Sequence, residues 1–352
     1  MAVTPLRVAD RWIAPGERVN VNVPLPSLYT QSPVFLPVQV MHGRREGPCL
    51  FVTAAIHGDE INGVEIIRRL MTWSALRNLR GTLLAVPVVN VYGFVRQSRY
   101  LPDRRDLNRS FPGSETGSLA ARLAFTLTRE VVQCASHGID LHTGAIHRDN
   151  LPQVRATLSN DDGTLALARA FGAPVILDAE LRDGSLRSEA AARGIPSLVY
   201  EAGEALRFDE LAIRAGLRGI QCVMRHLGMI KGGGMRRPAG APEPMLARSS
   251  LWVRAHQSGV LRSQTPLGSR VAEGDVLGII ADPFRNLEEP VRAPSDGLVI
   301  GRTNLPLVTE GEALYHVARF GRPEQAAAMV ERFQSELDPD QDLEPEAQPP
   351  IV

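Results

Sequence analysis

Short apolar runs alternate with amphipathic segments from residue 34 to residue 230, and this alternation limits the fold more than any other feature of the sequence. The apolar runs have the length of buried β-strands. Strands that alternate with helices predict an α/β fold, with a mainly parallel or mixed sheet flanked by helices on both faces. The predicted strands are 34–41, 50–56, 82–89, 138–141, 153–157, 175–177 and 197–200.

Three segments between these strands show helical spacing. In 60–73, for example, Ile61, Val64 and Ile67 recur on one helical face. The segments 118–134 and 211–227 carry similar apolar stripes. In sheets of this kind, ligands bind where strands end and loops begin, so polar residues at strand ends are the candidates for a site.

The character of the chain changes after residue 230. Residues 1–230 are predicted to form the α/β domain, and 231–244 form a Gly/Pro-rich linker. Residues 245–320 contain short β runs with a weak internal repeat that resembles the two halves of a biotinyl/lipoyl-type barrel-sandwich. Such domains carry a prosthetic group on a lysine, but the only lysine of the chain is Lys231. We therefore expect a small β-barrel-like lid domain without a covalent group.

The last stretch, 321–352, is predicted to contain a short helix over 323–336 and then an acidic, proline-bearing tail. The tail lacks a core-forming pattern and is expected to be disordered.

Composition limits the classes of partner that the protein is expected to bind. Among 352 residues, 39 basic and 39 acidic side chains give a net charge of zero, which does not favour nucleic acid or an anionic membrane. We see no apolar stretch of signal-peptide or membrane-spanning length, so a cytoplasmic protein is expected. The cysteines Cys49, Cys134 and Cys222 are widely spaced, which argues against a disulfide framework. The sequence allows a homo-oligomer but does not indicate one.

The strongest candidate for chemistry is the run from His57 to Glu60, which lies between an apolar strand and an amphipathic helix. A His and a Glu at this spacing can turn toward one point, and both supply ligand atoms that zinc accepts. Gly58 between them is expected to allow a tight turn. Taken alone, this pair is more often a capped helix start.

A second strand ends in His142, two residues after Asp140. His142 would complete a His–Glu–His set of metal ligands, and Asp140 would orient one of the imidazoles. Such a set leaves one position of zinc open, which is typical of catalytic sites, and zinc lowers the pKa of bound water to about 7. We expect one Zn²⁺ per chain.

A turn-rich loop, 99–113, contains four arginines. Arg109 follows Asn108 and is flanked by apolar residues that should hold it in place, so this pair is suited to a forked contact with a substrate carboxylate. Arg99 is the candidate for stabilising the oxyanion that forms during attack. Arg104 and Arg105 are interpreted as solvated surface residues.

The strand 197–200 is followed by Glu201, which can be aimed into a cleft at the strand ends. A carboxylate there can accept a proton from the attacking water and deliver it to a leaving nitrogen. Glu204 is the rival base, but we expect it to lie beyond a turn and to cap the following helix.

The chain resembles the succinylglutamate desuccinylase/aspartoacylase family of zinc carboxypeptidase-like hydrolases. The resemblance is carried by four motifs, which occur in the family's order: HGDE, DLNRSFPG, DLHTG and YEAGE. The resemblance covers most of residues 35–230. It implies the following roles: zinc ligands His57, Glu60 and His142, substrate-carboxylate contacts Asn108 and Arg109, a carbonyl-polarising Arg99, and the general base Glu201. It also implies that the C-terminal β domain acts as a lid. No motif identifies the family's substrate-binding tyrosine, and Tyr315 is left out of the site.

Three functions remain open at this point. The first is a zinc amide hydrolase that deacylates a small N-acyl amino acid, held through its α-carboxylate. The second is a metallocarboxypeptidase that trims a peptide C-terminus, since the same chemistry and the same carboxylate contact serve both. The third is a non-catalytic zinc or ligand-binding protein. The lid favours the first function, and the presence of Glu201 beside the three ligands argues against the third.

Overall fold

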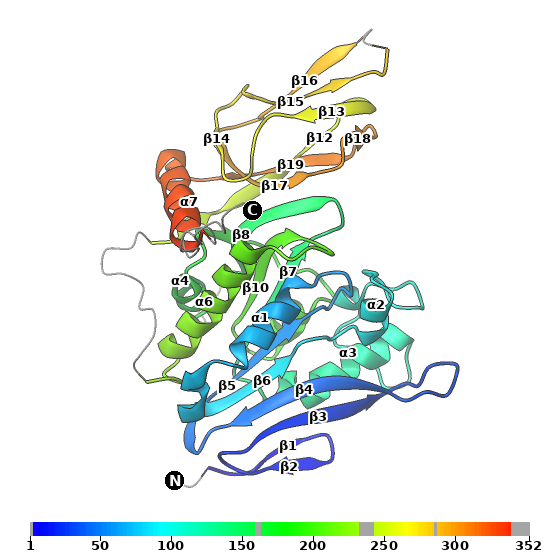
Figure 1. Ribbon diagram of the computed structural model, residues 1–352, viewed down its shortest axis with the longest axis vertical. Coiled ribbons are helices and arrows are strands. Elements are labelled where there is room, and N and C mark those ends of the chain that lie inside the picture. The colour runs from blue at the N-terminus through cyan, green and yellow to red at the C-terminus, as the bar shows by residue number, and fades with distance from the viewer. Residues whose placement is uncertain (1–2, 159–162, 232–242, 285–286, 339–352) are drawn as a thin grey trace, which may run out of the picture.

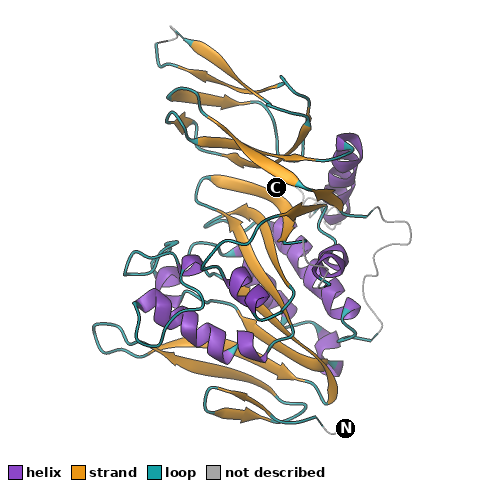
Figure 2. Cartoon of the chain, turned by 180° about the vertical axis from the view of Figure 1, so that it is seen from behind, coloured by secondary structure: helices purple, strands orange, loops and turns teal. Residues whose placement is uncertain are grey.

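A central twisted sheet with helices on both faces makes up most of the molecule, and strands of the C-terminal region extend the sheet at one end (Figures 1 and 2). The computed structural model describes residues 3–158, 163–231, 243–284 and 287–338. The predicted linker and the acidic tail fall largely on 232–242 and 339–352, which lie outside the described residues. None of the helices in the described ranges combines the length and apolar character that crossing a membrane requires.

Four central strands run parallel in the order β6-β5-β7-β10. They are β5 (Arg45–Ala54), β6 (Arg80–Val86), β7 (His137–Gly144) and β10 (Ser197–Glu204). Because these strands point the same way, the carboxyl ends of β5, β7 and β10 meet at one edge. Antiparallel strands flank this parallel centre on both sides, so the sheet as a whole is mixed, which is one of the two forms that the sequence predicted.

On one flank, β4 (Val34–His42) pairs with β6, and β3 (Arg18–Leu25) pairs with β4. The sequence analysis missed β3, although Val21, Val23 and Leu25 are buried and alternate with exposed residues as in an edge strand. It also missed a small hairpin of β1 (Leu6–Val8) and β2 (Arg11–Ile13).

Helices cover the two faces of the central sheet and bury separate cores. One core contains residues of α1 (Asn62–Leu70), α4 (Thr164–Phe171) and α6 (Glu210–His226). The other contains residues of α2 (Val91–Val95), α3 (Leu119–Glu130) and α5 (Leu186–Ala192). Helices α1, α3 and α6 lie within the three predicted helical segments except for one residue at the start of α6. Short 3-10 helices are η1 (Ser74–Asn78), η2 (Leu107–Arg109) and η3 (Val132–Cys134).

The expectation that Glu204 caps a helix is wrong. Glu204 is the last residue of β10, and its carboxylate accepts hydrogen bonds from the His147 backbone N–H at 2.9 Å and from Asn304 Nδ2 at 2.9 Å. The cap of α6 is Asp209, which accepts from Ala212 N at 3.0 Å. The β10 strand therefore continues through the YEAGE motif instead of ending before it.

The C-terminal region is joined to the main sheet by two strand pairings. Strand β17 (Gly297–Thr303) pairs with β8 (Arg148–Ala156), and β11 (Met245–Ala247) pairs with β9 (Val175–Asp178). A separate four-stranded sheet has the order β16-β15-β13-β18. The remaining bounds are β12 (Ser249–Arg254), β13 (Gly259–Ser263), β14 (Arg270–Val271), β15 (Val276–Ala281), β16 (Glu288–Arg292), β18 (Leu307–Val308), β19 (Ala313–Arg319) and α7 (Pro323–Leu337). Helix α7 matches its prediction.

Candidate active site

His57 and Glu60 lie in the short connection between β5 and α1. The chain leaves β5 at Ala54 and turns through Ala55, whose φ of 50° is left-handed. A side chain on Gly58 would come within 2.1 Å of the Gly93 carbonyl carbon. Because Gly58 itself has no positive φ, its role is to allow close approach of the Gly93 backbone, and not a special turn conformation as the sequence suggested.

The structure brings His57, Glu60 and His142 together, and their ligand atoms all lie within 4.8 Å of one another. Glu60 is 2% exposed, and its two oxygens face the Nδ1 atoms of His57 and His142, each at 2.7 Å. His142 comes from β7, the neighbour of β5 in the sheet. Two imidazoles and one carboxylate in a buried, compact group could hold a metal ion.

Each imidazole contacts a further carboxylate on its other side. Asp106 Oδ1 lies 3.2 Å from His57 Nε2, and Asp140 Oδ2 lies 2.8 Å from His142 Nε2. Thr53 Oγ1 in turn donates to Asp140 Oδ1 at 2.7 Å. Carboxylates that orient metal-ligating histidines in this way are common around metal sites. Asp140 was a candidate from the sequence, whereas Asp106 was missed, although it is the first residue of the DLNRSFPG motif, because only Asn108 and Arg109 of that motif were given a role.

The charges around the group favour a cation. Burial opposes the charged imidazole of His57, but Glu60 and Asp106 outweigh burial and raise its pKa. The pKa of His142 is raised in the same way by Asp140 and Glu60. Burial would raise the pKa of the Glu60 carboxyl, yet the two imidazoles hold it well below its usual range. Three carboxylates thus surround two imidazoles, and this surplus of negative charge suits a divalent ion.

Arg99 lies at the edge of the same group. Its Nη1 is 3.3 Å from Glu60 Oε1, and its Nη2 donates to Asp106 Oδ2 at 2.9 Å. Burial would lower the pKa of this guanidinium, but Glu60 and Asp106 raise it. The side chain lines the cavity described below, so the loop places it beside the candidate metal ligands.

Asn108 and Arg109 are held by the 3-10 helix η2. Asp106 caps this helix and accepts from Asn108 N at 2.8 Å. Leu107 beside them is fully buried, as the flanking apolar pattern predicts. The Asn108 side-chain oxygen accepts from Leu186 N at 2.9 Å, and Arg109 Nη1 donates to the Asn108 carbonyl. The side-chain oxygen of Asn108 is therefore already hydrogen-bonded to the first residue of α5. The side chains of Asn108 and Arg109 both line the cavity.

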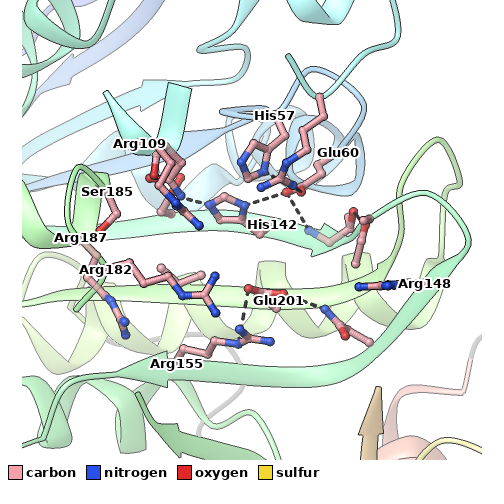
Figure 3. A pocket seen from close by; sticks show the side chains of 18 of the residues that line it. His57, Glu60, Arg109, His142, Arg148, Arg155, Arg182, Ser185, Arg187 and Glu201 are labelled. Atoms are coloured by element: carbon pink, nitrogen blue, oxygen red, sulfur yellow. Dashed lines mark hydrogen bonds and ion pairs between the residues drawn. The ribbon is translucent and has the colours of Figure 1, made fainter. Parts of the chain in front are cut away.

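Glu201 lies on β10 directly beside His142 of β7 in the parallel register. Its Oε2 accepts from Asn150 Nδ2 at 2.7 Å, and its Oε1 lies 3.4 Å from Arg155 Nε. Both of these partners belong to β8, on the other side of β10. The carboxylate faces the cavity and is held from the side opposite the histidines (Figure 3).

A cavity of about 470 Å³ is lined by every site residue predicted from the sequence, which are His57, Glu60, Arg99, Asn108, Arg109, His142 and Glu201. Tyr315 does not line it, and its hydroxyl donates to Leu277 O and lies within hydrogen-bond distance of Ser263 Oγ inside the C-terminal region. The C-terminal strands contribute Trp252, Arg254 and Ala313 to the wall. The cavity therefore lies between the central sheet and the C-terminal region.

The lining of the cavity is strongly cationic. Its arginines outnumber its carboxylates, which are Glu60, Asp140 and Glu201. In Figure 3, Arg109, Arg182 and Arg187 lie on one side of Glu201, and Arg148 lies on the other. Burial and the neighbouring Arg155 lower the pKa of Arg187 to about 10. Guanidinium groups that repel one another in a buried wall are stabilised by an anion placed between them. The arginines are Arg99, Arg109, Arg148, Arg155, Arg182, Arg187 and Arg254.

Sequence reasoning missed five of these arginines. Arg155 carried a usable signal, because a charged residue inside a predicted buried strand needs a partner or a function. Arg182 and Arg187 surround the start of α5, which was not predicted. Arg254 lies on a strand 99 residues after Arg155, and only the fold brings the two to one cavity.

The fold and the site define an α/β protein with a buried His–Glu–His group, which could hold a metal ion, in an arginine-lined cavity. The sequence profile of the succinylglutamate desuccinylase/aspartoacylase catalytic domain matches residues 46–227. An N-alpha-acetyl-L-2,4-diaminobutyric acid deacetylase of Halomonas elongata is 30% identical over 298 residues, which cover 81% of this chain and 86% of that protein. The chain belongs to the succinylglutamate desuccinylase/aspartoacylase family.

Two solved structures show the same architecture over nearly their whole length. The succinylglutamate desuccinylase/aspartoacylase of Rhodobacter sphaeroides is similar with a TM-score of 0.77 and 28% identity, covering 86% of this chain and 96% of that one. The product-bound ectoine utilization protein EutE (DoeB) of Ruegeria pomeroyi also has a TM-score of 0.77, with 26% identity, covering 90% of this chain and 98% of that one.

If His57, Glu60 and His142 hold one metal ion, the chain dialysed against zinc should retain about one equivalent, and His142→Ala should retain almost none. Asp140→Asn should weaken zinc binding by about 10- to 100-fold, because the imidazole of His142 loses its orienting partner. Metal analysis by mass spectrometry measures both. His147→Ala is the matched control, since His147 is an exposed histidine of the loop between β7 and β8. Equal zinc in His142→Ala and the native chain would remove His142 from the site.

Proposed function

We propose that this chain is a zinc-dependent amide hydrolase that removes the acyl group from a small N-acyl amino acid. The observation that carries the proposal is the arrangement of one cavity, in which His57, Glu60 and His142 lie on one side of Glu201 and cationic side chains surround them. Each part of the reaction then has a residue suited to it. The name of the Halomonas relative, a deacetylase of an N-acetylated amino acid, supports the same class of reaction.

The three ligands suit zinc because two imidazoles and a carboxylate leave one coordination position open, as in catalytic zinc sites. Bound there, zinc would polarise the substrate carbonyl and lower the pKa of water to about 7. Asp106 and Asp140 would keep both imidazoles in the required orientation.

Glu201 is proposed as the general base. Its carboxylate would accept a proton from the water that attacks the amide carbon and then deliver it to the nitrogen as the C–N bond breaks, so that the products are a carboxylic acid and a free amine. Arg99 would stabilise negative charge on the carbonyl oxygen, because its guanidinium lies beside Glu60 at the cavity wall.

Asn108 and Arg109 are proposed to bind the α-carboxylate of the substrate. Arg182 and Arg187 lie on the same side of the cavity and add positive charge there (Figure 3). With so many guanidinium groups, the cavity favours an anionic substrate over a neutral one. Its volume of about 470 Å³ and the wall formed by Trp252 and Arg254 favour a small molecule over a peptide C-terminus.

For the C-terminal region, we propose a β-barrel-sandwich domain over residues 245–320, following the catalytic domain 1–230 and the linker 231–244. Strand β12, β19 and β17 form one layer, and β16, β15, β13 and β18 form the other, in support of two packed sheets. The lack of lysine in this region supports a role as a cavity wall without a covalent prosthetic group.

The reaction class is tested by incubating the zinc-loaded full chain with N-succinyl-L-glutamate, N-acetyl-L-aspartate, Nα-acetyl-L-2,4-diaminobutyrate and short peptides, and by detecting released amine. We expect at least one N-acyl amino acid to be hydrolysed much faster than any peptide, and activity to disappear with chelator and return with zinc. Faster release from peptides would instead support a carboxypeptidase. Zinc binding without any release of amine would support the non-catalytic alternative.

The carboxylate contact is tested with Arg109→Lys. A lysine keeps the charge but lacks the planar fork, so KM should rise by about 10-fold or more for an exposed bidentate contact. The same substrate with its carboxylate converted to an amide should be poor for the native chain. Arg105→Lys, in the same loop but outside the cavity lining, should be unchanged. Undiminished turnover of the amidated substrate would show that Arg109 has another role.

The proposed base is tested with Glu201→Gln. Its zinc content should stay at the native level, because Glu201 is not among the ligands, while kcat should fall by about 10²- to 10⁴-fold. Glu204→Gln should be milder, since Glu204 is engaged with His147 N and Asn304 instead of the cavity. A nearly active Glu201→Gln beside an inactive Glu204→Gln would show that the wrong carboxylate of this motif has been assigned.

A further inference from the structure

A row of residues crosses five strands from the C-terminal region to the proposed base. In the antiparallel registers, Trp252 of β12 lies opposite His316 of β19, and His316 lies opposite Gly301 of β17. Gly301 lies opposite Asn150 of β8, and Asn150 lies opposite Gly203 of β10. Residues directly opposite each other in a sheet project from the same face. The row therefore connects the wall of the cavity with the strand that carries Glu201.

Asn150 is the member of the row that contacts Glu201. It is 6% exposed, and its Nδ2 donates to Glu201 Oε2 at 2.7 Å. The register between β8 and β10 shifts between Glu201 and Gly203. In a regular register Asn150 would lie opposite the residue after Gly203, and the shift brings its amide closer to the Glu201 carboxylate. The half-buried carboxylate of Glu201 is held in one orientation by this donor, because leaving the buried Asn150 amide unpaired would cost free energy.

Gly301 provides the space that the Asn150 amide occupies. A methyl group on Gly301 would lie 2.9 Å from Asn150 Oδ1 and 3.2 Å from His316 Cβ. The backbone of Gly301 is not left-handed, so an alanine there meets a steric obstacle only. The movable neighbour is the end of the Asn150 side chain, which would have to shift and would disturb the hydrogen bond that its amide donates to Glu201.

Ring stacking holds the two members of the row that lie furthest from Glu201, Trp252 and His316, in place. The rings of Trp252 and His316 stack with centroids 4.6 Å apart and an interplanar angle of 9°. The Arg148 guanidinium lies over the Trp252 ring at 5.3 Å. Because Arg148 belongs to β8, this contact ties the C-terminal strands to the strand that carries Asn150.

Without Asn150, one cationic partner would compete for the carboxylate. Arg155 Nε lies 3.4 Å from the other oxygen of Glu201. Several arginines line this side of the cavity and make it strongly positive, and burial together with Arg155 lowers the pKa of Arg187 there. A freed carboxylate would turn toward Arg155. Asn150 therefore opposes the attraction that would draw the base out of its orientation.

We propose that Asn150 is a positioning residue for Glu201, and that the C-terminal strands act on the proposed base through the space left by Gly301. The inference rests on the proposed role of Glu201 as the base. It assigns the C-terminal region a part in catalysis beyond that of a cavity wall. Asn150 itself transfers no proton and binds no metal.

The test measures kcat, KM and zinc content for Asn150→Ala and Gly301→Ala in the zinc-loaded full chain, with the best substrate of the panel above. We expect kcat to fall by about 10- to 100-fold for each variant, because even a small displacement of a reacting group from its productive position can lower the rate by this much. KM should change by less than about threefold, and zinc content should not change, since neither residue contacts the carboxylate-binding side or the metal ligands.

Two further variants separate positioning from folding. Asn150→Asp keeps the shape of the side chain but removes the donor and repels Glu201, so its kcat should fall at least as far as that of Asn150→Ala. Thr303→Ala is the matched control, because Thr303 is buried in the same pair of strands and bonds His147 O but does not contact Glu201. Its kcat should stay at the native level. If Thr303→Ala lost as much activity as Gly301→Ala, the effect would be structural, and the proposal would be wrong.

A double-mutant cycle shows whether Asn150 acts through Glu201. Once Glu201→Gln has removed the base, adding Asn150→Ala should lower kcat no further, whereas independent effects would multiply. A native kcat in Asn150→Ala, beside an inactive Glu201→Gln, would overturn this inference and leave the proposed function intact. A fully active Glu201→Gln, or no hydrolysis of any panel compound by the native chain, would overturn both.

Discussion

The buried carboxylate of Glu60 is the interaction on which the site depends. With 2% exposure, it would be costly to hold as an isolated charge, and it is stabilised because His57 and His142 face its two oxygens at 2.7 Å. Those histidines come from the ends of adjacent parallel strands. The strand order of the central sheet therefore has an electrostatic consequence, since a different order would leave Glu60 buried without His142.

Negative charge at the candidate metal ligands and positive charge elsewhere in the cavity divide the site into two parts. Asp106 and Asp140 concentrate negative charge behind the two imidazoles, which suits a cation. Arg155, Arg182 and Arg187 gather on another wall, where burial and the neighbouring guanidinium groups lower the pKa values of Arg182 and Arg187. A substrate with a carbonyl at one end and a carboxylate at the other would match both charge distributions at once, and the same separation would keep its carboxylate away from the candidate metal ligands.

Much of the central fold, and the grouping of His57, Glu60 and His142, could be predicted because the signals are local. Apolar runs mark the buried strands, and polar residues at their ends mark a common edge. The extent of β10 could not be predicted in this way. Gly203 suggested a turn, but the strand continues with an irregular register to Glu204, so that Asp209 caps α6 instead. The arginines of the cavity wall were missed because they come from segments that only tertiary packing brings together.

The C-terminal strands illustrate why a repeat detected in the sequence describes such a region incompletely. The lysine-free repeat predicts a small β domain without a covalent prosthetic group, and it contains no information on which face meets the rest of the chain. In the structure, β17 adds to the edge of β8, so the central sheet and the C-terminal strands share a hydrogen-bonded ladder. A ladder of this kind transmits small displacements better than a surface contact does, because its register leaves little freedom to slide. Gly301 lies in that ladder opposite Asn150, at the point where a single added methyl group would reach the side chain that holds Glu201.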